Sequence, residues 1–242
     1  MSESFPVLGV KIKITTMKSA VAEICEHVEL NKQMMIVTAN PEIVMMCKND
    51  DYYKKIVNSA DAVFADGVGI VWAGRHLGYN IPERIAGFDL TLELFQIANA
   101  NKYKIFLFGA HDGIAEKAIE KIQQKHPDIE FVGCRHGFFK EGQVCEIIEE
   151  INAAKPDILL VALGAPKQEK FIFENKDKLD CKIFLGIGGA FDVLAGKSKR
   201  APAVWQKCGL EWFYRLCMQP QRIGRMLSIP KFVFHVLLSK KN

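Results

Sequence analysis

Hydrophobic and polar positions follow two patterns that alternate along the chain. In the first, apolar residues stand side by side in short runs; in the second, they recur every three or four positions among charged residues. The first pattern is typical of strands buried on both faces, and the second of amphipathic helices. Strands are predicted at 34–38, 60–66, 104–109, 129–134, 157–164 and 182–189. Helices are predicted at 41–49, 89–100, 112–124, 143–154 and 166–176, with Asp89 as the N-cap of the second.

This alternation of strand and helix predicts an α/β fold with a parallel sheet and helices on both of its faces. Right-handed crossovers between the strands then give a Rossmann-like, doubly wound domain. The pattern leaves the order of the strands open. Ligands of such sheets bind beyond the carboxyl ends of the strands, so the loops at these ends are expected to form the site. They lie at 38–42, 65–69, 109–113, 164–169 and 186–192.

The C-terminal part of the chain differs from the rest in charge. Residues 196–242 contain ten Lys and Arg and one acidic residue, Glu211, whereas residues 1–195 carry a net charge of −5. Segment 210–217 places apolar and aromatic residues at helical spacing. We therefore predict a Rossmann-like core, 1–195, and a basic, amphipathic helical appendage, 196–242, that associates with an anionic membrane surface. A helical pair packed on the core is the alternative. Nucleic acid is not expected, because no binding motif accompanies the charge.

Composition adds further limits. The chain has 242 residues, of which 49% are hydrophobic and 25% charged, as in ordinary globular proteins. Its seven Cys form no C-x-x-C pair, which favours a reducing cytoplasm over a zinc site or a disulfide framework. The first residues lack the pattern of a secretory signal, and the apolar runs are shorter than the ~18 residues of a membrane span. Neither kind of segment is therefore expected.

Asp66 has the most distinctive surroundings of the candidate residues. It ends an apolar run and is followed at once by Gly67 and Gly69. Taken alone, such an aspartate is a helix cap, a turn residue or a catalytic base. Its place at a predicted strand end puts it in the expected crevice, so a role as a base depends on which other groups gather there.

The Gly-rich loops favour phosphate over a dinucleotide cofactor. Gly188 and Gly189 offer backbone N–H groups to a phosphate, and Asp192 offers a carboxylate to a ribose or a uracil. A G-x-G-x-x-G fingerprint is missing, because the glycines after Asp66 are followed by Trp72 in place of the third glycine. No cluster of His, Cys and carboxylates has metal-ligand spacing, and no D-x-D follows an apolar run. Neither a metal nor a cofactor is expected.

Taken together, the loops resemble the WecG/TagA/CpsF glycosyltransferases. The matching motifs run in order from about residue 7 to 235. They are TANPE (38–42), FADGVG (64–69), RIAGFD (84–89), LGAPKQE (163–169), GIGGAFDVLAG (186–196), RAP (200–202) with Trp205, and the arginine pattern of 215–225. A series of this length is far more specific than any one loop.

The resemblance implies an inverting, metal-independent transfer of N-acetylmannosamine from its UDP donor to GlcNAc-diphosphate-undecaprenol. The product would be a β-1,4 disaccharide, as in the branch of the family that makes the linkage unit of wall teichoic acid. The protein would act as a peripheral protein at the cytoplasmic face of the cell membrane. UDP-ManNAcA or UDP-glucose as donor, and a non-catalytic, membrane-tethered nucleotide-binding module, stay open as alternatives. So does a homo-oligomer.

The resemblance also implies roles for individual residues. Asp66 matches the family's proposed base, which takes the proton of the acceptor hydroxyl while UDP leaves from the opposite face. The leaving diphosphate would be stabilised by three arginines of the appendage, or these would contact lipid headgroups instead: Arg215, Arg222 and Arg225. Further substrate-binding residues are expected in the loops: Thr38, Asn40, Arg84 and Gln168.

Overall fold

The computed structural model describes residues 3–207, 209–218 and 223–239. Its centre is a six-stranded sheet with the order β4-β3-β8-β7-β5-β6, in which all neighbouring strands are parallel. The strands are β3 (Met34–Ala39), β4 (Ala62–Ala65), β5 (Lys104–Gly109), β6 (Glu130–Arg135), β7 (Ile158–Ala162) and β8 (Ile183–Gly186). An antiparallel hairpin, β1 (Ser4–Val7) and β2 (Val10–Lys13), precedes them. The predicted Rossmann-like α/β fold is confirmed.

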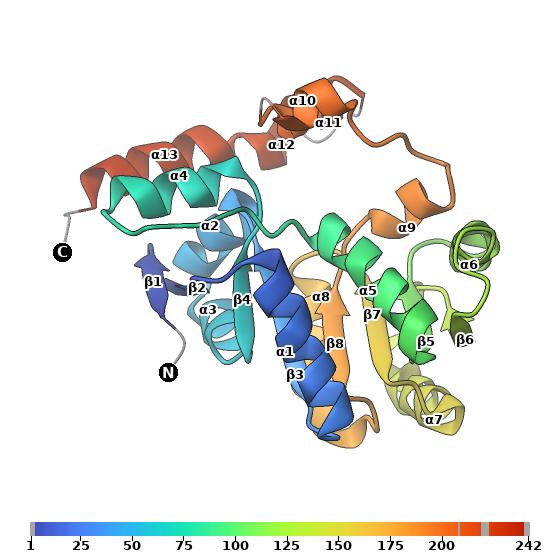
Figure 1. Cartoon of the computed structure of the whole chain (residues 1–242). Coiled ribbons are helices and arrows are strands. Elements are labelled where there is room, and N and C mark those ends of the chain that lie inside the picture. The colour runs from blue at the N-terminus through green and yellow to red at the C-terminus, as the bar shows by residue number, and fades with distance from the viewer. Residues whose placement is uncertain (1–2, 208, 219–222, 240–242) are drawn as a thin grey trace.

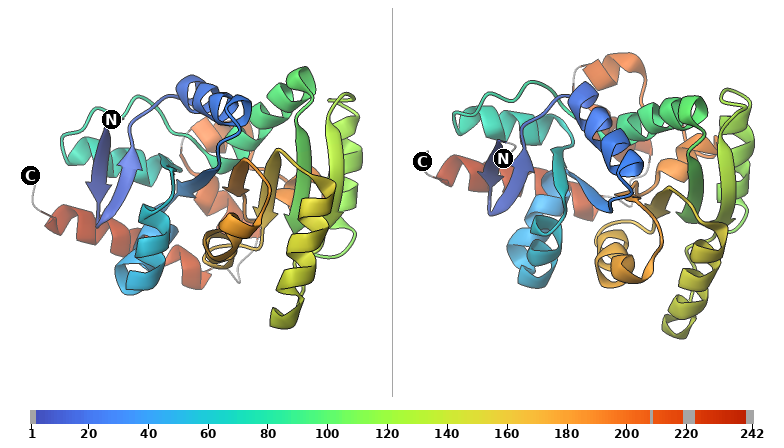
Figure 2. Two further views of the ribbon diagram at one scale, coloured as in Figure 1. Left: turned by 90° about the horizontal axis from the view of Figure 1, so that it is seen from below. Right: turned by 60° about the horizontal axis from the view of Figure 1, so that its bottom comes forward.

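Helices cover both faces of the sheet (Figures 1 and 2). One core cluster includes buried side chains of α2 (Pro41–Asn49), α3 (Asp51–Asn58), α4 (Val68–His76), α7 (Val144–Ala154), α8 (Lys167–Asn175) and α13 (Ser228–Leu238). The other includes those of α1 (Met17–Glu29), α5 (Gly87–Asn101), α6 (Ile114–Gln123) and α9 (Ala190–Leu194). Because side chains of the strands alternate between these two clusters, the sheet is the shared wall of both cores.

Further short helices lie in the connections and at the C-terminal end of the chain. Two 3-10 helices, η1 (Glu141–Gln143) and η2 (Lys176–Lys178), precede α7 and follow α8. Three short helices, α10 (Ala203–Lys207), α11 (Glu211–Met218) and α12 (Ile223–Met226), lead to α13. In Figure 1 they lie above the carboxyl ends of the strands, to which the chain returns after α9. The C-terminal segment thus covers the edge of the sheet at which ligands of this fold bind.

The hydrophobic pattern predicted every strand of the large sheet and missed other elements. The hairpin and helices α1, α3, α4 and α9 were not among the predicted elements. The interpretation of Asp89 as an N-cap was wrong: α5 begins at Gly87, so Asp89 lies within the first turn. Its carboxylate instead forms ion pairs with Arg84 and Arg200. The signal that misled the prediction was the residue type, because Asp is among the common N-cap residues.

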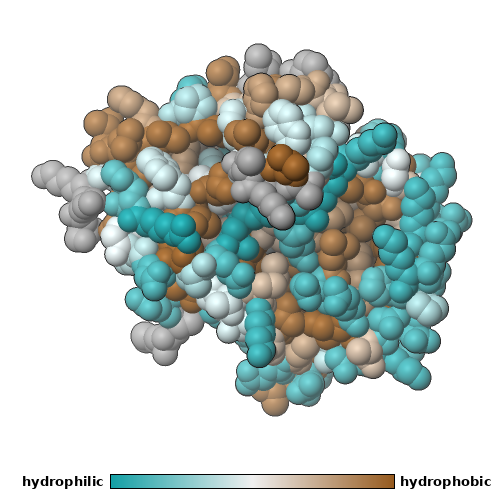
Figure 3. Space-filling model, turned by 45° about the horizontal axis from the view of Figure 1, so that its top comes forward, coloured by the Kyte–Doolittle hydropathy of each residue, from teal (hydrophilic) through white to brown (hydrophobic). Residues whose placement is uncertain are grey.

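Helix α13 joins the core through one face only. Phe232 and Val236 are fully buried in the cluster that contains α2 and α4. On the other face Phe234, Leu237 and Leu238 are more than half exposed. Figure 3 shows apolar residues gathered along the upper left of the molecule in that view. Within the described residues, no helix is both long enough and apolar enough to cross a membrane.

Candidate functional site

Loops from four adjacent strands border a cavity of about 330 Å³. Residues at the carboxyl ends of β4, β3, β8 and β7 form one wall, including Asp66, Thr38, Gly188 and Gly164. Residues of the C-terminal segment form the facing wall: Arg200, Gly209, Glu211, Trp212, Met226, Ser228 and Ile229. Four of the five loops that the sequence singled out contribute to the described lining, as does segment 84–88, whereas loop 109–113 contributes no described residue.

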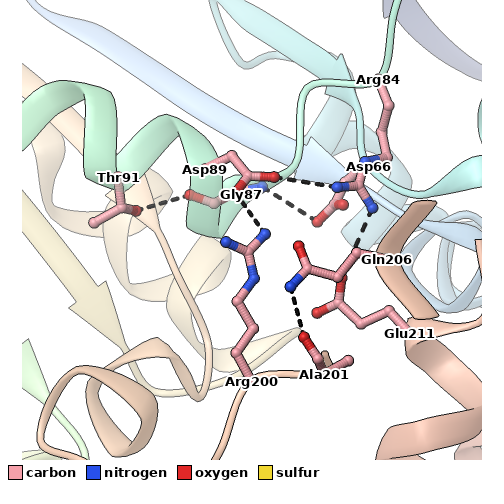
Figure 4. A network of polar contacts seen from close by, with 9 residues as sticks. All are labelled: Asp66, Arg84, Gly87, Asp89, Thr91, Arg200, Ala201, Gln206 and Glu211. Atoms are coloured by element: carbon pink, nitrogen blue, oxygen red, sulfur yellow. Dashed lines mark hydrogen bonds and ion pairs between the residues drawn. The ribbon is translucent and has the colours of Figure 1, made fainter. Parts of the chain in front are cut away.

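Asp66 stands directly beyond β4. Its backbone N–H donates to the carbonyl of Ala39 at 2.9 Å, which continues the ladder between β3 and β4 by one residue. Gly67, with a φ of 86°, is the N-cap of α4, so Asp66 does not occupy that position. Its Oδ2 accepts a hydrogen bond from the backbone N–H of Gly87 at 3.4 Å (Figure 4). The carboxylate is therefore held at the cavity wall by main-chain geometry.

Thr38, near the end of β3, and Asn40, directly after it, line the same cavity. A Cβ atom on Gly87 would lie 2.6 Å from Thr38 Oγ1, so α5 can approach β3 this closely only with glycine at its start. Asn40 is the N-cap of α2, and its Oδ1 accepts from the Ile43 N–H at 3.0 Å. One end of the Asn40 amide thus fixes a helix, and its Nδ2 has no hydrogen-bond partner among the described residues.

Gln168 ties two of the loops together. Its Oε1 accepts from the backbone N–H groups of Gly188 at 2.9 Å and Gly164 at 3.2 Å. Its Nε2 donates to Glu169 Oε1 at 2.7 Å. A Cβ atom on Gly186 would lie 2.5 Å from Gln168 Nε2, so glycine is needed where β8 ends. Gln168 is only 4% exposed. Its hydrogen bonds hold the loops of Gly164 and Gly188 in place at the cavity wall.

Behind Gln168 lies a buried acid, Glu169, which the sequence analysis included in a motif without assigning it a role. Glu169 is 2% exposed, and its Oε2 accepts a hydrogen bond from the Tyr53 hydroxyl at 3.0 Å. Burial raises the pKa of the Glu169 carboxyl, and the hydrogen bonds from Gln168 and Tyr53 act in the opposite direction. Burial also raises the pKa of Tyr53, and the neighbouring Glu169 adds to that rise. Tyr53 therefore stays a donor at neutral pH.

An ionic network joins the two walls of the cavity (Figure 4). Asp89 pairs with Arg84 at 3.1 Å and with Arg200 at 2.5 Å, and Arg84 pairs with Glu211 at 3.7 Å. The Arg200 guanidinium also lies over the Phe88 ring, 4.6 Å from its centroid. Both arginines line the cavity that Asp66 borders, so positive charge faces the candidate base.

Two of these residues were not recognised from the sequence. Arg200 appeared only as the start of a motif, and Glu211 only as the single acidic residue of the C-terminal segment. That isolation was a usable signal, because a lone acid among ten basic residues is more easily explained by a specific partner than by solvation. The partner, Arg84, lies 127 positions away in the sequence and could not be inferred without the fold.

The other predicted site residues differ in how they are placed. Gly188 and Gly189 line the cavity, whereas Asp192 is not among its described lining residues and pairs with Lys197 at 3.4 Å. Arg222 and the side chains of Arg215 and Arg225 lie outside the described part of the structure. Among the residues that are described, no group of three or more His, Cys, Asp or Glu side chains is arranged to hold a metal ion.

The fold and the site define an α/β protein whose Rossmann-like sheet presents a cavity with an acid and two guanidinium groups at its carboxyl edge. The chain belongs to the glycosyl transferase WecG/TagA/CpsF family, whose model matches residues 5–242. The family resemblance of the loop motifs is thereby confirmed.

Three relatives share one name, N-acetylglucosaminyldiphosphoundecaprenol N-acetyl-beta-D-mannosaminyltransferase. The protein of Bacillus spizizenii is 39% identical over 211 residues, which are 87% of this chain and 81% of the relative. The protein of Bacillus subtilis is 38% identical over 208 residues, or 86% and 80% of the two chains. The protein of Staphylococcus aureus strain MRSA252 is 36% identical over 238 residues, or 97% and 92%. The similarity thus extends over both walls of the cavity.

Proposed function

We propose that this protein transfers N-acetylmannosamine from UDP-ManNAc to GlcNAc-diphosphate-undecaprenol, forming the β-1,4 linkage of the wall teichoic acid linkage unit. The family membership and the shared name of the relatives support the reaction class and the acceptor. The observation that carries the proposal is the single cavity that Asp66 shares with Arg84 and Arg200. An inverting transfer from a nucleotide sugar can use a base for the acceptor hydroxyl and guanidinium groups for the leaving diphosphate.

In this mechanism Asp66 is the general base. It takes the proton of the acceptor hydroxyl as the oxygen forms its bond to the anomeric carbon. The bond from that carbon to the β-phosphate oxygen breaks, and its electron pair leaves with UDP on the opposite face of the sugar. One such displacement inverts the configuration, through a transition state with oxocarbenium character like that of glycoside hydrolysis.

The departing diphosphate gains negative charge that must be stabilised. A guanidinium can bind phosphate oxygens through two parallel hydrogen bonds, and Arg84 and Arg200 both line the cavity. The arginines of the appendage, Arg215, Arg222 and Arg225, are proposed from the family resemblance to add to this charge. We propose that these groups take the place that a divalent cation has in metal-dependent transferases.

The remaining residues are assigned to binding. Thr38 and Asn40 are proposed to hydrogen-bond the sugars, since both line the cavity next to Asp66. The loop of Gly188 and Gly189 is proposed to hold the nucleotide, and Gln168 to act on that loop by positioning it. Asp192 stays a proposal for the ribose or uracil, and reaching either would require it to leave Lys197.

The site of action is proposed to be the cytoplasmic face of the membrane, with the protein attached peripherally. The support is the combination in residues 196–242 of ten basic residues with exposed apolar side chains such as Phe213, Phe234 and Leu238. A polyprenol-linked acceptor stays in the bilayer, so an enzyme that uses it gains from binding the same surface. Whether a homo-oligomer forms there stays open to measurement.

The test is UDP release with a panel of UDP-sugars and a lipid-linked GlcNAc-diphosphate acceptor, measured with and without EDTA. We expect UDP-ManNAc to give the highest turnover, with EDTA causing no loss. Preference for UDP-ManNAcA or UDP-glucose would correct the donor, and loss in EDTA that Mg²⁺ restores would overturn the assignment of the diphosphate charge to arginine. Binding of UDP without turnover of any pair would favour a non-catalytic module.

A further inference from the structure

A second, larger cavity adjoins the first on the outer side of α4. Its volume is about 610 Å³, and it is called here the α4 groove. It is lined by Val68, Val71, Trp72, Arg75, His76, Glu83 and Arg84. Four of these residues follow the spacing i, i+3, i+4, i+7 along α4, which places them on one face of the helix. Glu83 and Arg84, in the segment that connects α4 to α5, form the other wall of the groove.

The α4 groove is continuous with the cavity that holds Asp66. Val68 and Arg84 line both spaces, and Val68 is only two residues beyond Asp66. A ligand that reaches Asp66 with one end can therefore extend past Arg84 and along α4. Such a ligand would meet the Asp66 carboxylate at one end and the apolar side chains and Arg75 of α4 along the rest of its length.

The walls of the groove suit an anion joined to a hydrocarbon. Val68 and Trp72 expose 45% and 38% of their surface, and the Trp72 ring is stacked with His76 at 5.4 Å. Arg75 and Arg84 supply positive charge; one nitrogen of Arg75 donates to the carbonyl of Ile81 at 3.0 Å. The acid in the wall, Glu83, accepts a hydrogen bond from the backbone N–H of Met17.

We propose that the α4 groove binds the first isoprene units of the acceptor lipid, with the lipid diphosphate at Arg75. The proposal rests on the function proposed above, because it assigns the tail of the same acceptor. The groups that line the two spaces are those that a sugar-diphosphate-isoprenoid needs: the Asp66 carboxylate for the sugar hydroxyl, Arg75 for the diphosphate, and Val71 and Trp72 for the hydrocarbon. Exposed apolar side chains are thereby covered when the acceptor binds.

The test uses GlcNAc-diphosphate acceptors that carry one, two or three isoprene units, at concentrations below micelle formation. For the wild type, KM should fall at least tenfold from one unit to three, because each buried CH₂ contributes about 0.8 kcal/mol. In Trp72→Ser this dependence on chain length should shrink to less than threefold. The control is Phe234→Ser, which removes a 60% exposed aromatic ring that does not line the groove, and it should keep the full dependence.

Two results would overturn the proposal that the α4 groove binds the lipid. One is an unchanged dependence in Trp72→Ser; the other is an equal loss in Phe234→Ser, which would point to a general apolar surface such as a membrane contact. Direct binding of farnesyl diphosphate separates this failure from a failure of the proposed function. If no acceptor is turned over but the wild type binds this probe at least tenfold more tightly than Trp72→Ser, the groove stands and the reaction does not. Arg75→Gln should weaken binding of farnesyl diphosphate. Binding of farnesol, which lacks the diphosphate, should stay unchanged.

Discussion

The two walls of the cavity with Asp66 are built in different ways. The wall formed by the strand-end loops is fixed by main-chain hydrogen bonds, as at Asp66 and Gly87, and by the buried amide of Gln168. The wall formed after Gly196 is joined to the core at this point by ion pairs, Arg200 with Asp89 and Arg84 with Glu211. The first wall has the rigidity of the sheet, whereas the second is attached through groups that an anion can compete for.

This difference indicates how each wall contributes to the reaction. Partly exposed ion pairs contribute only about 0–1 kcal/mol each, so a diphosphate can displace a carboxylate from a guanidinium at little cost. Until it does, Asp89 and Glu211 hold the arginines at the cavity. The proposed base needs a fixed position, and the proposed phosphate-binding groups need partners that they can exchange. The contrast can be tested by changing one wall at a time.

The largest effect is expected at the rigid wall, from Asp66→Asn. The amide keeps the size of the side chain but cannot accept the proton of the acceptor, so kcat should fall about 10²- to 10⁴-fold. Affinity for UDP should stay within about twofold, measured by calorimetry, because the nucleotide is assigned to other loops. Asp112→Asn, at another strand end, is the matched control and should keep full turnover. If Asp66→Asn turns over as fast as the wild type, Asp66 is not the base.

How much of this wall could be predicted from the sequence follows from its physical origin. Buried parallel strands are continuous apolar runs, so the large sheet and its strand-end loops were visible, and with them Thr38, Asn40 and Asp66. The order β4-β3-β8-β7 was not visible, because it is set by packing between distant segments. Glu169 was hidden for the same reason, since its hydroxyl partner Tyr53 lies 116 positions away.

The ion-paired wall was harder to predict. Amphipathic spacing and charge showed that residues after Gly196 differ from the core, but neither shows which side chains face inward. Asp89 was interpreted as a helix cap because local sequence contains no sign of Arg200, 111 positions away. Burial of Phe232 against α2 and α4 was likewise invisible in the pattern of α13, whose two faces are both apolar. Long-range pairs are a property of the fold, and of the four residues in these ion pairs the family resemblance gave a role to Arg84 alone.

The second largest effect is expected from Arg200→Gln, at the exchangeable wall. Loss of a charged hydrogen-bonding group costs about 1.5–3 kcal/mol, so kcat/KM should fall by roughly 10- to 100-fold. Arg200→Lys should recover part of the loss, since lysine supplies charge but not the planar pair of donors. Lys199→Gln removes an exposed neighbouring charge and serves as the control. Equal losses in Arg200→Gln and Lys199→Gln would mean that net charge, and not this position, matters.

Glu169→Gln weakens the rigid wall without touching the cavity. Gln can accept on one oxygen only, so Tyr53 and Gln168 cannot both remain hydrogen-bond donors to this side chain, and the free energy of unfolding should fall by about 1–3 kcal/mol. Burial raises the folded-state pKa of Glu169 above its ordinary value of 4.5. The wild type therefore loses stability from this group as pH rises from about 4.5 through the folded pKa, and the variant does not.

Urea unfolding of both proteins between pH 4 and pH 8 measures this difference. The gap in free energy should be widest near pH 4 and should narrow as the pH rises, with the other titrating groups cancelling between the two proteins. A gap that widens with pH would mean that the folded-state pKa of Glu169 is lowered, so that its hydrogen bonds outweigh its burial. Since Gln168 positions Gly188, the variant should also raise KM for the donor more than KM for the acceptor.

The smallest effect, and the sharpest test of exchange, is expected from Glu211→Gln. If a diphosphate displaces Glu211 from Arg84, removing its charge should raise UDP affinity, by at most about fivefold for an ion pair of about 0–1 kcal/mol. The same variant should be cut faster by protease in the segment after Gly196 when no UDP is present, because one attachment of that wall is weakened. Glu149→Gln, an exposed acid on α7, should change neither property. Weaker UDP binding in Glu211→Gln would show the opposite: that the carboxylate supports Arg84 in the complex and that the two walls differ in chemistry but not in their freedom to rearrange.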